Sequence, residues 1–330
     1  MTEVNMKKIR WGIVGTGNIA HRFARAICHV EDASLRAVAS RNIAAANAFG
    51  DEFSIPVRFG SYEEMAQSGE IDAVYIAVPH GLHADTSILF LKQKTAVLCE
   101  KPLSVNKKEA MRMIACAKEN DTFLMEAMWA NTLPGTRKLK EIAESGQLGD
   151  IMGVQGSFCY NMDDEPEHHV FQNANGGGGL LDVGVYGLTF ASWFMKSPVA
   201  EIKAAADVRN GVDVHCTALI RYEDGAIADI SSALLLRKPN EGYVFGTKGY
   251  MKTVRFYAAQ EITLCIDGEE DKVIETPFKG NGFEEEIEEV DRCLLAGKKE
   301  SELVPHSHTL FIMEQMDEIR RQIGVAYPQD

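Results

Sequence analysis

The sequence predicts an α/β fold followed by an α+β fold. We expect a doubly wound parallel sheet in the N-terminal half and a large, mainly antiparallel open sheet in the C-terminal half. From Lys8 to Ala127, short apolar runs alternate with amphipathic segments, which is typical of parallel strands joined by helices. After residue 150, strand-like runs follow one another with short turns, which indicates antiparallel pairing. Two domains are therefore expected, residues 1–127 and residues 128–330.

Five apolar runs are the expected strands of the first half. They lie at residues 10–14, 35–40, 73–78, 96–100 and 122–127. Helical periodicity is found between the strands, over residues 18–29, 42–53, 83–93 and 105–119. In the last of these helices Ala110, Met113, Ile114 and Ala117 share one face, and Ser104 is a suitable N-cap.

The second half begins with an expected helix over residues 134–145, which Gly146 ends. Gly225 and the GTKG stretch at 246–249 are typical of hairpin turns. The expected strands are residues 150–160, 200–209, 213–222, 225–236, 241–247, 250–257 and 260–276. Two helices close the chain, over residues 284–296 and 308–323, each followed by a glycine.

Composition excludes several classes of protein. The 330 residues are 45% hydrophobic and 25% charged, which is ordinary for a globular protein. The net charge of −14 argues against a nucleic-acid partner. No apolar run reaches the roughly 18 residues of a membrane span. The N-terminal stretch MTEVNMKKIRWGIVG lacks the long apolar core of a signal peptide, so we expect a cytoplasmic protein without a membrane partner.

The potential metal ligands do not cluster in the sequence. Seven cysteines are scattered without any C-x-x-C spacing, which favours reduced thiols over disulfides or a zinc site. The histidine pairs 80/83, 168/169 and 306/308 have no companion ligands at convincing spacing, so no metal is expected.

A glycine-rich turn follows the first expected strand. Gly15, Gly17 and Ala20 have the spacing G-x-G-x-x-A between that strand and the first helix. The first glycine permits a tight turn, and the second lets the backbone approach a pyrophosphate at the helix N-terminus. The small third residue allows close packing of the helix on the strand. This context predicts a dinucleotide site.

The end of the second expected strand indicates which dinucleotide binds. A site for NAD needs a carboxylate there for the ribose 2′-hydroxyl. Here Ser40 is followed by Arg41, and no acid occurs before Asp51. Arginine can bind a 2′-phosphate through several charge-assisted hydrogen bonds, so NADP is the favoured cofactor and NAD remains possible. Alternatively, Arg41 is a solvated residue at a helix start.

The stretch TAVLCEKPLSV places Lys101 at the end of an expected buried strand, directly before Pro102. A lone lysine there would most simply be a charged strand end that reaches water. The carboxyl ends of parallel strands are also where ligands bind, and a proline restrains the backbone that holds the lysine.

Several motifs together resemble the Gfo/Idh/MocA oxidoreductase family. They are GTGNIA, VPHGLH, CEKPLSVN and GGGGLLDVGVYGL, and the similarity runs almost from end to end. The phrase LMEAMWANTLP and the tyrosine at 186 point to the branch of dihydrodiol and D-xylose dehydrogenases. Relatives in that branch usually have arginine and phenylalanine where this chain has Asn131 and Thr132, which leaves the substrate open.

The resemblance implies a role for each matching residue. The expected catalytic residues are Lys101, Tyr186 and Asp182. The expected cofactor-binding residues are Gly15, Gly17, Asn18, Ile19, Ser40, Arg41, Pro79, His80, His83, Glu100, Lys101 and Trp129. The expected substrate-binding residues are Lys101, Trp129, Phe158, Asp182 and Tyr186. It also implies a homodimer or a dimer-based homo-oligomer through the open sheet.

These residues suggest hydride transfer between NADP and a secondary alcohol or carbonyl of a sugar, polyol or vicinal diol. A tyrosine could take the alcohol proton, but its ordinary pKa of about 10 is too high for a base near neutrality. The ammonium of Lys101 would lower the pKa of Tyr186 and bind the substrate oxygen. Taken alone, Tyr186 would be a core tyrosine and Asp182 a surface ion-pair partner. An inactive NAD(P)-binding sensor and a reductase of a non-sugar unsaturated substrate are the alternatives.

Overall fold

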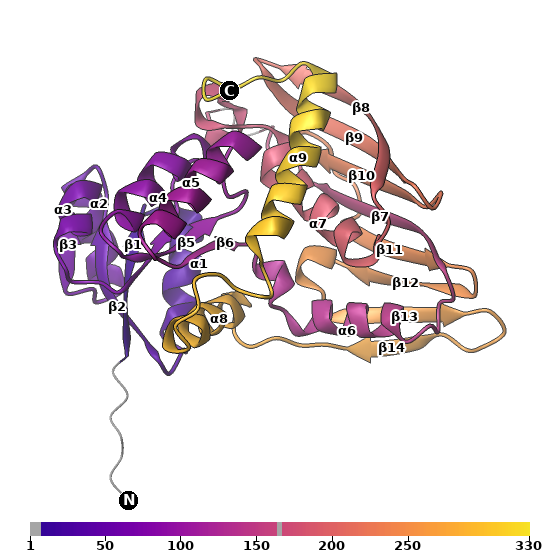
Figure 1. Cartoon of the computed structure of the whole chain (residues 1–330), viewed down its shortest axis with the longest axis horizontal. Helices are drawn as coiled ribbons and strands as arrows, with labels where there is room; N and C mark the ends of the chain where they lie inside the picture. Colours follow the sequence, from indigo (N-terminus) through magenta and orange to yellow (C-terminus); the bar gives the residue numbers. More distant parts are fainter. Residues whose placement is uncertain (1–7, 164–166) are drawn as a thin grey trace, which may run out of the picture. The chain divides into compact units, whose positions relative to one another are not determined.

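The structure is a computed structural model, and it describes residues 8–163 and 167–330 (Figure 1). These residues form two compact units. The first contains residues up to Ser104 together with Lys108–Trp129 and Lys279–Thr309, and the second contains Val105–Lys107, Ala130–Phe278 and Leu310–Asp330. The first seven residues, which form part of the stretch used to predict location, lie outside the described residues.

A parallel six-stranded sheet is the centre of the first unit, in the order β3-β2-β1-β4-β5-β6. The strands are β1 (Ile9–Val14), β2 (Ala33–Ala39), β3 (Val57–Phe59), β4 (Ala73–Ile76), β5 (Ala96–Glu100) and β6 (Leu124–Ala127). The strand order reverses between β1 and β4, as in a doubly wound sheet, so the expected fold is confirmed. The short edge strand β3 was not predicted, because three half-buried residues give no clear periodicity.

Helices connect these strands and cover the sheet. They are α1 (Asn18–Ile27), α2 (Ile43–Glu52), α3 (Tyr62–Gln67), η1 (His80–Leu82), α4 (His83–Leu91), α5 (Lys107–Glu119) and η2 (Trp129–Asn131). In the core, the rings of Phe23 on α1 and Tyr75 on β4 are stacked with centroids 3.9 Å apart. The buried face of α1 thus fixes this helix over the central strands.

The helix α8 (Phe283–Leu295) belongs to the first unit, although it follows the whole of the second sheet in the sequence. Asp291 on α8 accepts a hydrogen bond from Trp11 Nε1 on β1 at 2.9 Å. The expected division at residue 127 follows chain order, whereas the packing returns residues 279–309 to the first unit. The sequence of an acidic helix with one apolar stripe does not indicate which sheet that helix covers.

An eight-stranded sheet forms the second unit, in the order β14-β13-β12-β11-β7-β10-β9-β8 (Figure 1). Its strands are β7 (Ile151–Cys159), β8 (Val199–Arg209), β9 (Val212–Tyr222), β10 (Ile227–Ala233), β11 (Glu241–Gly246), β12 (Gly249–Val254), β13 (Glu261–Ile266) and β14 (Lys272–Glu275). β7 and β10 are parallel, and the other neighbours are antiparallel. The expected strand 260–276 is two strands, because the chain turns at Gly268, where φ is +81°.

The helical elements of the second unit include the segment with Asp182 and Tyr186. They are α6 (Pro134–Glu144), η3 (His169–Phe171), η4 (Asn173–Asn175), a π-helical turn (Leu180–Gly184), α7 (Val185–Phe194) and η6 (Phe256–Ala258). The last helix, α9 (His306–Ile323), begins among the residues of the first unit. A Cβ on Gly187 would lie 2.5 Å from Ile230 on β10, so this glycine lets α7 pack closely on the sheet.

Candidate active site

The glycine turn fits a dinucleotide. Gly15 has φ +99°, and an added Cβ would lie 2.2 Å from the carbonyl oxygen of Ala77. An added Cβ on Gly17 would meet no atom within 4 Å, so the space in front of this residue is open. Asn18 and Ile19 form the first turn of α1, and that turn carries no acidic side chain. The exposed helix N-terminus can therefore bind a pyrophosphate through backbone N–H groups.

The end of β2 carries the predicted Ser40 and Arg41. The helix α2 that follows is capped by Asn42, whose Oδ1 accepts from the N–H of Ala44 at 2.9 Å. Arg41 is therefore not needed as a cap, and it lies exposed at the strand end. Burial raises the pKa of Tyr62, and the nearby charge of Arg41 opposes this effect. Arg41 is thus a surface cation beside the side chain of Tyr62.

The turn after β5 is held by side chains on both sides of Lys101. The Lys101–Pro102 peptide bond is cis. The N–H of Lys101 donates to Glu100 Oε2 at 3.1 Å, and Tyr75 Oη donates to the other oxygen of the same carboxyl. Burial raises the pKa of Glu100, while the charge of Lys101 and the hydroxyl of Tyr75 oppose the rise. The buried carboxyl of Glu100 therefore holds the backbone of Lys101 through a hydrogen bond.

The VPHGLH segment reaches the same turn through His83. The ring of His83 is fully buried, with Nδ1 2.9 Å from the oxygen of Pro102 and Nε2 2.8 Å from the oxygen of Val78. Burial lowers the pKa of His83 to about 4, so the ring is neutral at pH 7 and donates to one of the two carbonyls. Pro79 and His80 follow Val78 in the chain. His83 therefore joins the segment after β4 to the turn after β5.

Trp129 begins the short helix η2 just after β6, and it lies in a cluster that the sequence did not predict. Its ring is 5.3 Å from that of Phe283 on α8. The guanidinium of Arg22 on α1 lies 5.4 Å from the Trp129 ring and 4.7 Å from the Phe283 ring. Nothing in the sequence linked these residues, because they come from three distant segments.

The second unit brings Phe158, Asp182 and Tyr186 together. The ring of Phe158 on β7 lies 5.7 Å from the ring of Tyr186, and Tyr257 lies 5.5 Å from Tyr186 and stacks on Phe158 at 3.9 Å. Tyr160 Oη donates to a carboxyl oxygen of Asp182. Tyr160 and Tyr257 were missed, although Tyr160 comes only two residues after Phe158, directly beyond the end of β7.

The predicted site residues are thus divided between the units. Lys101 and Trp129 belong to the first unit, with the glycine turn, and Phe158, Asp182 and Tyr186 belong to the second.

Within residues 8–163 and 167–330, no group of three or more His, Cys, Asp or Glu side chains could hold a metal ion. No helix in this described part of the chain is long and apolar enough to cross a membrane.

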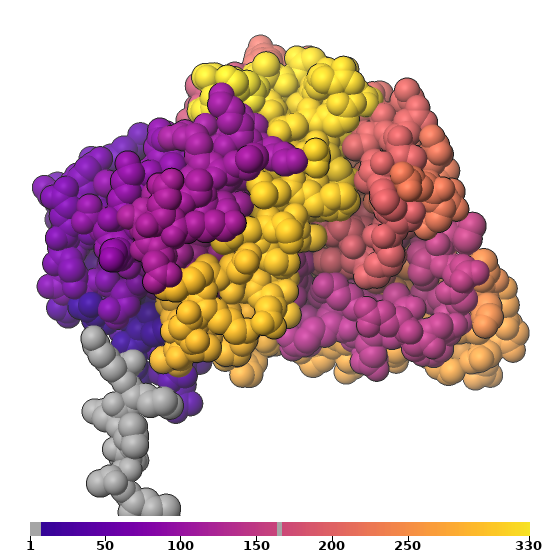
Figure 2. All heavy atoms as spheres, in the orientation of Figure 1, coloured from indigo at the N-terminus to yellow at the C-terminus, as the bar shows by residue number. Residues whose placement is uncertain are grey.

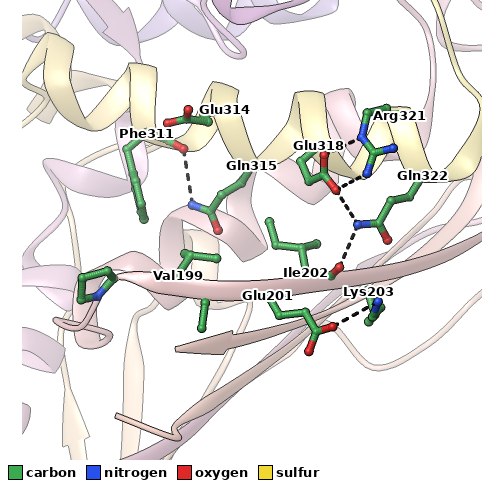
Figure 3. A pocket seen from close by; sticks show the side chains of 12 residues that line it. Val199, Glu201, Ile202, Lys203, Phe311, Glu314, Gln315, Glu318, Arg321 and Gln322 are labelled. Carbon is green, nitrogen blue, oxygen red and sulfur yellow. Dashed lines mark hydrogen bonds and ion pairs between the residues drawn. The ribbon is translucent and has the colours of Figure 1, made fainter. Parts of the chain in front are cut away.

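The second unit also contains a groove of about 620 Å³ between the edge strand β8 and helix α9. The space-filling view shows the residues of α9 beside those of β8 (Figure 2), and the groove is drawn in close-up in Figure 3. Glu318 pairs with Arg321 at 2.7 Å. The side-chain amide of Gln322 bonds to the backbone of Ile202 and Ala204 and covers part of the free edge of β8. No predicted site residue lines this groove.

The parallel sheet, its glycine turn and the open helix N-terminus define a dinucleotide-binding protein with an appended open-sheet domain. Residues 9–128 match the family model described as oxidoreductase family, NAD-binding Rossmann fold, and residues 136–252 match the GFO/IDH/MocA C-terminal domain. The chain belongs to the Gfo/Idh/MocA oxidoreductase family, which confirms the resemblance seen in the sequence. It is an oxidoreductase with an NAD-binding Rossmann domain.

Curated relatives match the chain over nearly its whole length. The trans-1,2-dihydrobenzene-1,2-diol dehydrogenase of Danio rerio is 34% identical over 338 residues, which cover 98% of this chain and 99% of the relative. The enzyme of the same name from Homo sapiens is 31% identical over 332 residues, with the same coverage of both chains.

Solved structures share the fold. A 3-ketoreductase from Actinomadura kijaniata in complex with NADP and TDP-benzene has a TM-score of 0.86 at 24% identity, covering 97% of this chain and 99% of the other. Levoglucosan dehydrogenase in complex with NADH and L-sorbose has a TM-score of 0.87 at 17% identity, covering 97% of both chains. At these identities the likeness extends to the fold alone.

Proposed function

We propose that the protein is an NADP-dependent oxidoreductase that transfers a hydride between the nicotinamide and a secondary alcohol or carbonyl of a sugar or vicinal diol. The observation that carries the proposal is the turn of Lys101 at the carboxyl end of β5. Side chains buried beneath this turn hold its backbone on both sides of the lysine. The carboxyl edge of a parallel sheet is where such folds bind ligands. The names of the diol dehydrogenase relatives support the substrate class.

In this proposal Tyr186 is the acid–base residue. A bound nicotinamide would supply the hydride chemistry at the carbon that bears the reacting hydroxyl or carbonyl oxygen. Tyr186 takes the proton of that hydroxyl during oxidation and gives a proton to the carbonyl oxygen during reduction. The side chain of Tyr186 is 7% exposed and packs beside Phe158 and Tyr257, which excludes water from the proton transfer.

Lys101 and Asp182 have different parts in this chemistry. We propose that the ammonium of Lys101 binds the reacting oxygen and stabilises the phenolate of Tyr186 as it forms. The carboxyl of Asp182 accepts a hydrogen bond from Tyr160, which fixes its orientation. Asp182 would then accept a hydrogen bond from a second hydroxyl of the substrate, as a diol or sugar provides.

The preference for NADP rests on Arg41 and Ser40. Arg41 is an exposed cation at the end of β2, and the neighbouring Asn42 already serves as the cap of α2. A 2′-phosphate would pair with the guanidinium of Arg41 and accept a hydrogen bond from the hydroxyl of Ser40.

The test is NADPH absorbance with the purified protein and a panel of aldoses, inositols, vicinal diols and dicarbonyls, with NAD in parallel. Lys101→Met and Tyr186→Phe are compared with two matched controls. These are Lys118→Met, at an exposed position of α5, and Tyr222→Phe, at a buried position of β9. We expect turnover that prefers NADP and that both site variants abolish while both controls retain it. NADPH binding without turnover would instead support the sensor. Turnover confined to an enal or cyclic imine would support the non-sugar reductase.

We also propose a homodimer through the outer face of the eight-stranded sheet. Large apolar side chains on this face are solvent-exposed in the single chain, which is typical of an interaction surface. They are Leu219, Ile227, Phe245, Tyr250 and Val254. Sedimentation velocity is expected to give a dimer, and Phe245→Glu is expected to give a monomer; a monomeric wild-type protein would contradict the proposal. The cytoplasmic location stays a prediction from the sequence.

A further inference from the structure

The backbone of the Lys101 turn is held at three consecutive residues by three different side chains. Glu100 accepts from the N–H of Lys101 at 3.1 Å, and His83 lies 2.9 Å from the oxygen of Pro102. The third contact comes from Glu126 on the neighbouring strand β6, whose Oε1 accepts from the N–H of Leu103 at 3.0 Å. Of these three side chains, Glu126 had no predicted function.

The burial of the Glu126 carboxyl is unfavourable for the stability of the fold. It is 5% exposed, and burial raises the pKa of its carboxyl, while the hydroxyl of Thr309 and the N–H of Leu103 oppose the rise. A buried carboxyl on a strand of the sheet needs partners, and an apolar residue would meet the packing need at less cost. Both neighbours in β6, Met125 and Ala127, are apolar and completely buried. The carboxyl therefore requires an explanation beyond filling space.

The second partner of Glu126 fixes the direction of its carboxyl. Thr309 Oγ1 on α9 donates to Oε2 at 2.7 Å, and both donors and the carboxyl are buried. The carboxyl thus spans from α9 to the turn after β5, with each oxygen engaged by one donor. An acceptor oriented in this way holds the N–H of Leu103, and hence the turn, in one position.

We infer that Glu126 is a positioning residue for Lys101. It sets the place of the ammonium by holding the peptide N–H two residues further along the chain. The inference rests on the proposed role of Lys101. A reacting group displaced by about 1 Å loses roughly 100-fold in rate, which is the effect we expect when this contact is removed.

The test compares Glu126→Ala with Glu126→Gln. Glutamine keeps one acceptor oxygen for the N–H of Leu103, and the hydroxyl of Thr309 can turn to accept from its amide. We expect kcat with D-xylose or a cyclic trans-1,2-diol to fall about 100-fold in Glu126→Ala and to stay within about fivefold in Glu126→Gln. The Kd of NADPH should stay within about twofold of wild type in both variants, because the glycine turn is untouched.

Hydrogen exchange of the Leu103 amide tests the same contact without any substrate. We expect exchange in Glu126→Ala to be at least about tenfold faster than in wild type, with protection restored in Glu126→Gln. Thr309→Val, which removes one donor and keeps the shape, should give a smaller loss of kcat, about fivefold. This milder change keeps the test valid if Glu126→Ala does not fold.

A control separates positioning from general loss of stability. Asp291→Asn changes another buried carboxyl of the same unit, far along the chain from the turn, and should leave kcat and the exchange of Leu103 unchanged. Equal losses of kcat in Glu126→Ala and Glu126→Gln would overturn the inference. Unchanged hydrogen exchange of the Leu103 amide in Glu126→Ala would overturn it as well. If Lys101→Met itself keeps full kcat, the proposed function fails, and the exchange result still decides whether Glu126 holds the turn.

Discussion

Two glycines of one turn should respond in opposite ways to the addition of a single methyl group. Gly15 has φ +99°, and a Cβ there would lie 2.2 Å from the carbonyl oxygen of Ala77. Gly17 has φ −81° and ψ −178°, an ordinary extended conformation, and its Cβ would meet no protein atom within 4 Å. The first glycine is thus required by the fold, whereas the second leaves space for a ligand.

The expected magnitudes follow from these contacts. A left-handed conformation costs alanine about 1–2 kcal/mol, and forced overlap with backbone adds about 1–3 kcal/mol. Gly15→Ala should therefore lower the free energy of unfolding by about 2–5 kcal/mol. At Gly17 the loss of a favourable N-cap glycine and the gain in backbone entropy nearly cancel, so Gly17→Ala should stay within about 1 kcal/mol of wild type.

The affinity for NADPH, in contrast to stability, should be lowered by the substitution at Gly17. The Cβ of Gly17→Ala would occupy the space through which the backbone approaches the pyrophosphate, so we expect the Kd of NADPH to rise at least about tenfold. Urea unfolding followed by circular dichroism measures stability, and fluorescence titration with NADPH measures affinity. Wild-type affinity in Gly17→Ala, or equal stability of the two variants, would refute the reasoning.

Three further predictions concern the charged and catalytic residues. Arg41→Ala should raise the Kd of NADP about 10-fold or more and leave that of NAD unchanged, as measured by titration with both cofactors. Tyr186→Phe should lower kcat at least about 100-fold without changing the Kd of NADPH, because it removes the proton acceptor and no cofactor contact; stopped-flow binding and steady-state turnover check this split. Burial raises the pKa of Asp213 to about 7, so the folded state holds a proton that the unfolded chain releases above about pH 4. Stability should therefore fall as pH rises from about 4 to 7 and then level off, and Asp213→Asn should flatten this part of a urea-unfolding profile.

The local pattern of the sequence was sufficient for the fold class and for the glycine-rich turn after the first strand. Alternating apolar runs and helical faces are properties of neighbouring residues, so they predicted the parallel sheet and the open sheet correctly. Gly15 and Gly17 were identified because a fixed turn needs fixed spacing. Lys101 was noticed at the end of a buried strand, but its expected role came from the family resemblance and stays a prediction. In each case a few consecutive residues carry the physical reason.

Other features depended on which distant segments pack together. The contact of α8 with β1 through Asp291 and Trp11, 280 residues apart, cannot be inferred from an amphipathic helix pattern. Asp182 and Tyr186 are four residues apart in the sequence, but Asp182 lies in a π-helical turn and Tyr186 lies in the α-helix α7. Such features depend on how side chains from different elements pack together, which cannot be predicted from the local sequence.

The environment of Lys101 shows the same division. Sequence alone placed a lysine and a proline after a strand and suggested chemistry there. The tertiary structure decided what holds this turn, by bringing His83 from the preceding β–α connection and Glu126 from the next strand to adjacent backbone groups. Backbone N–H and C=O groups are identical in every residue, so only the folded arrangement determines which side chain each of them meets.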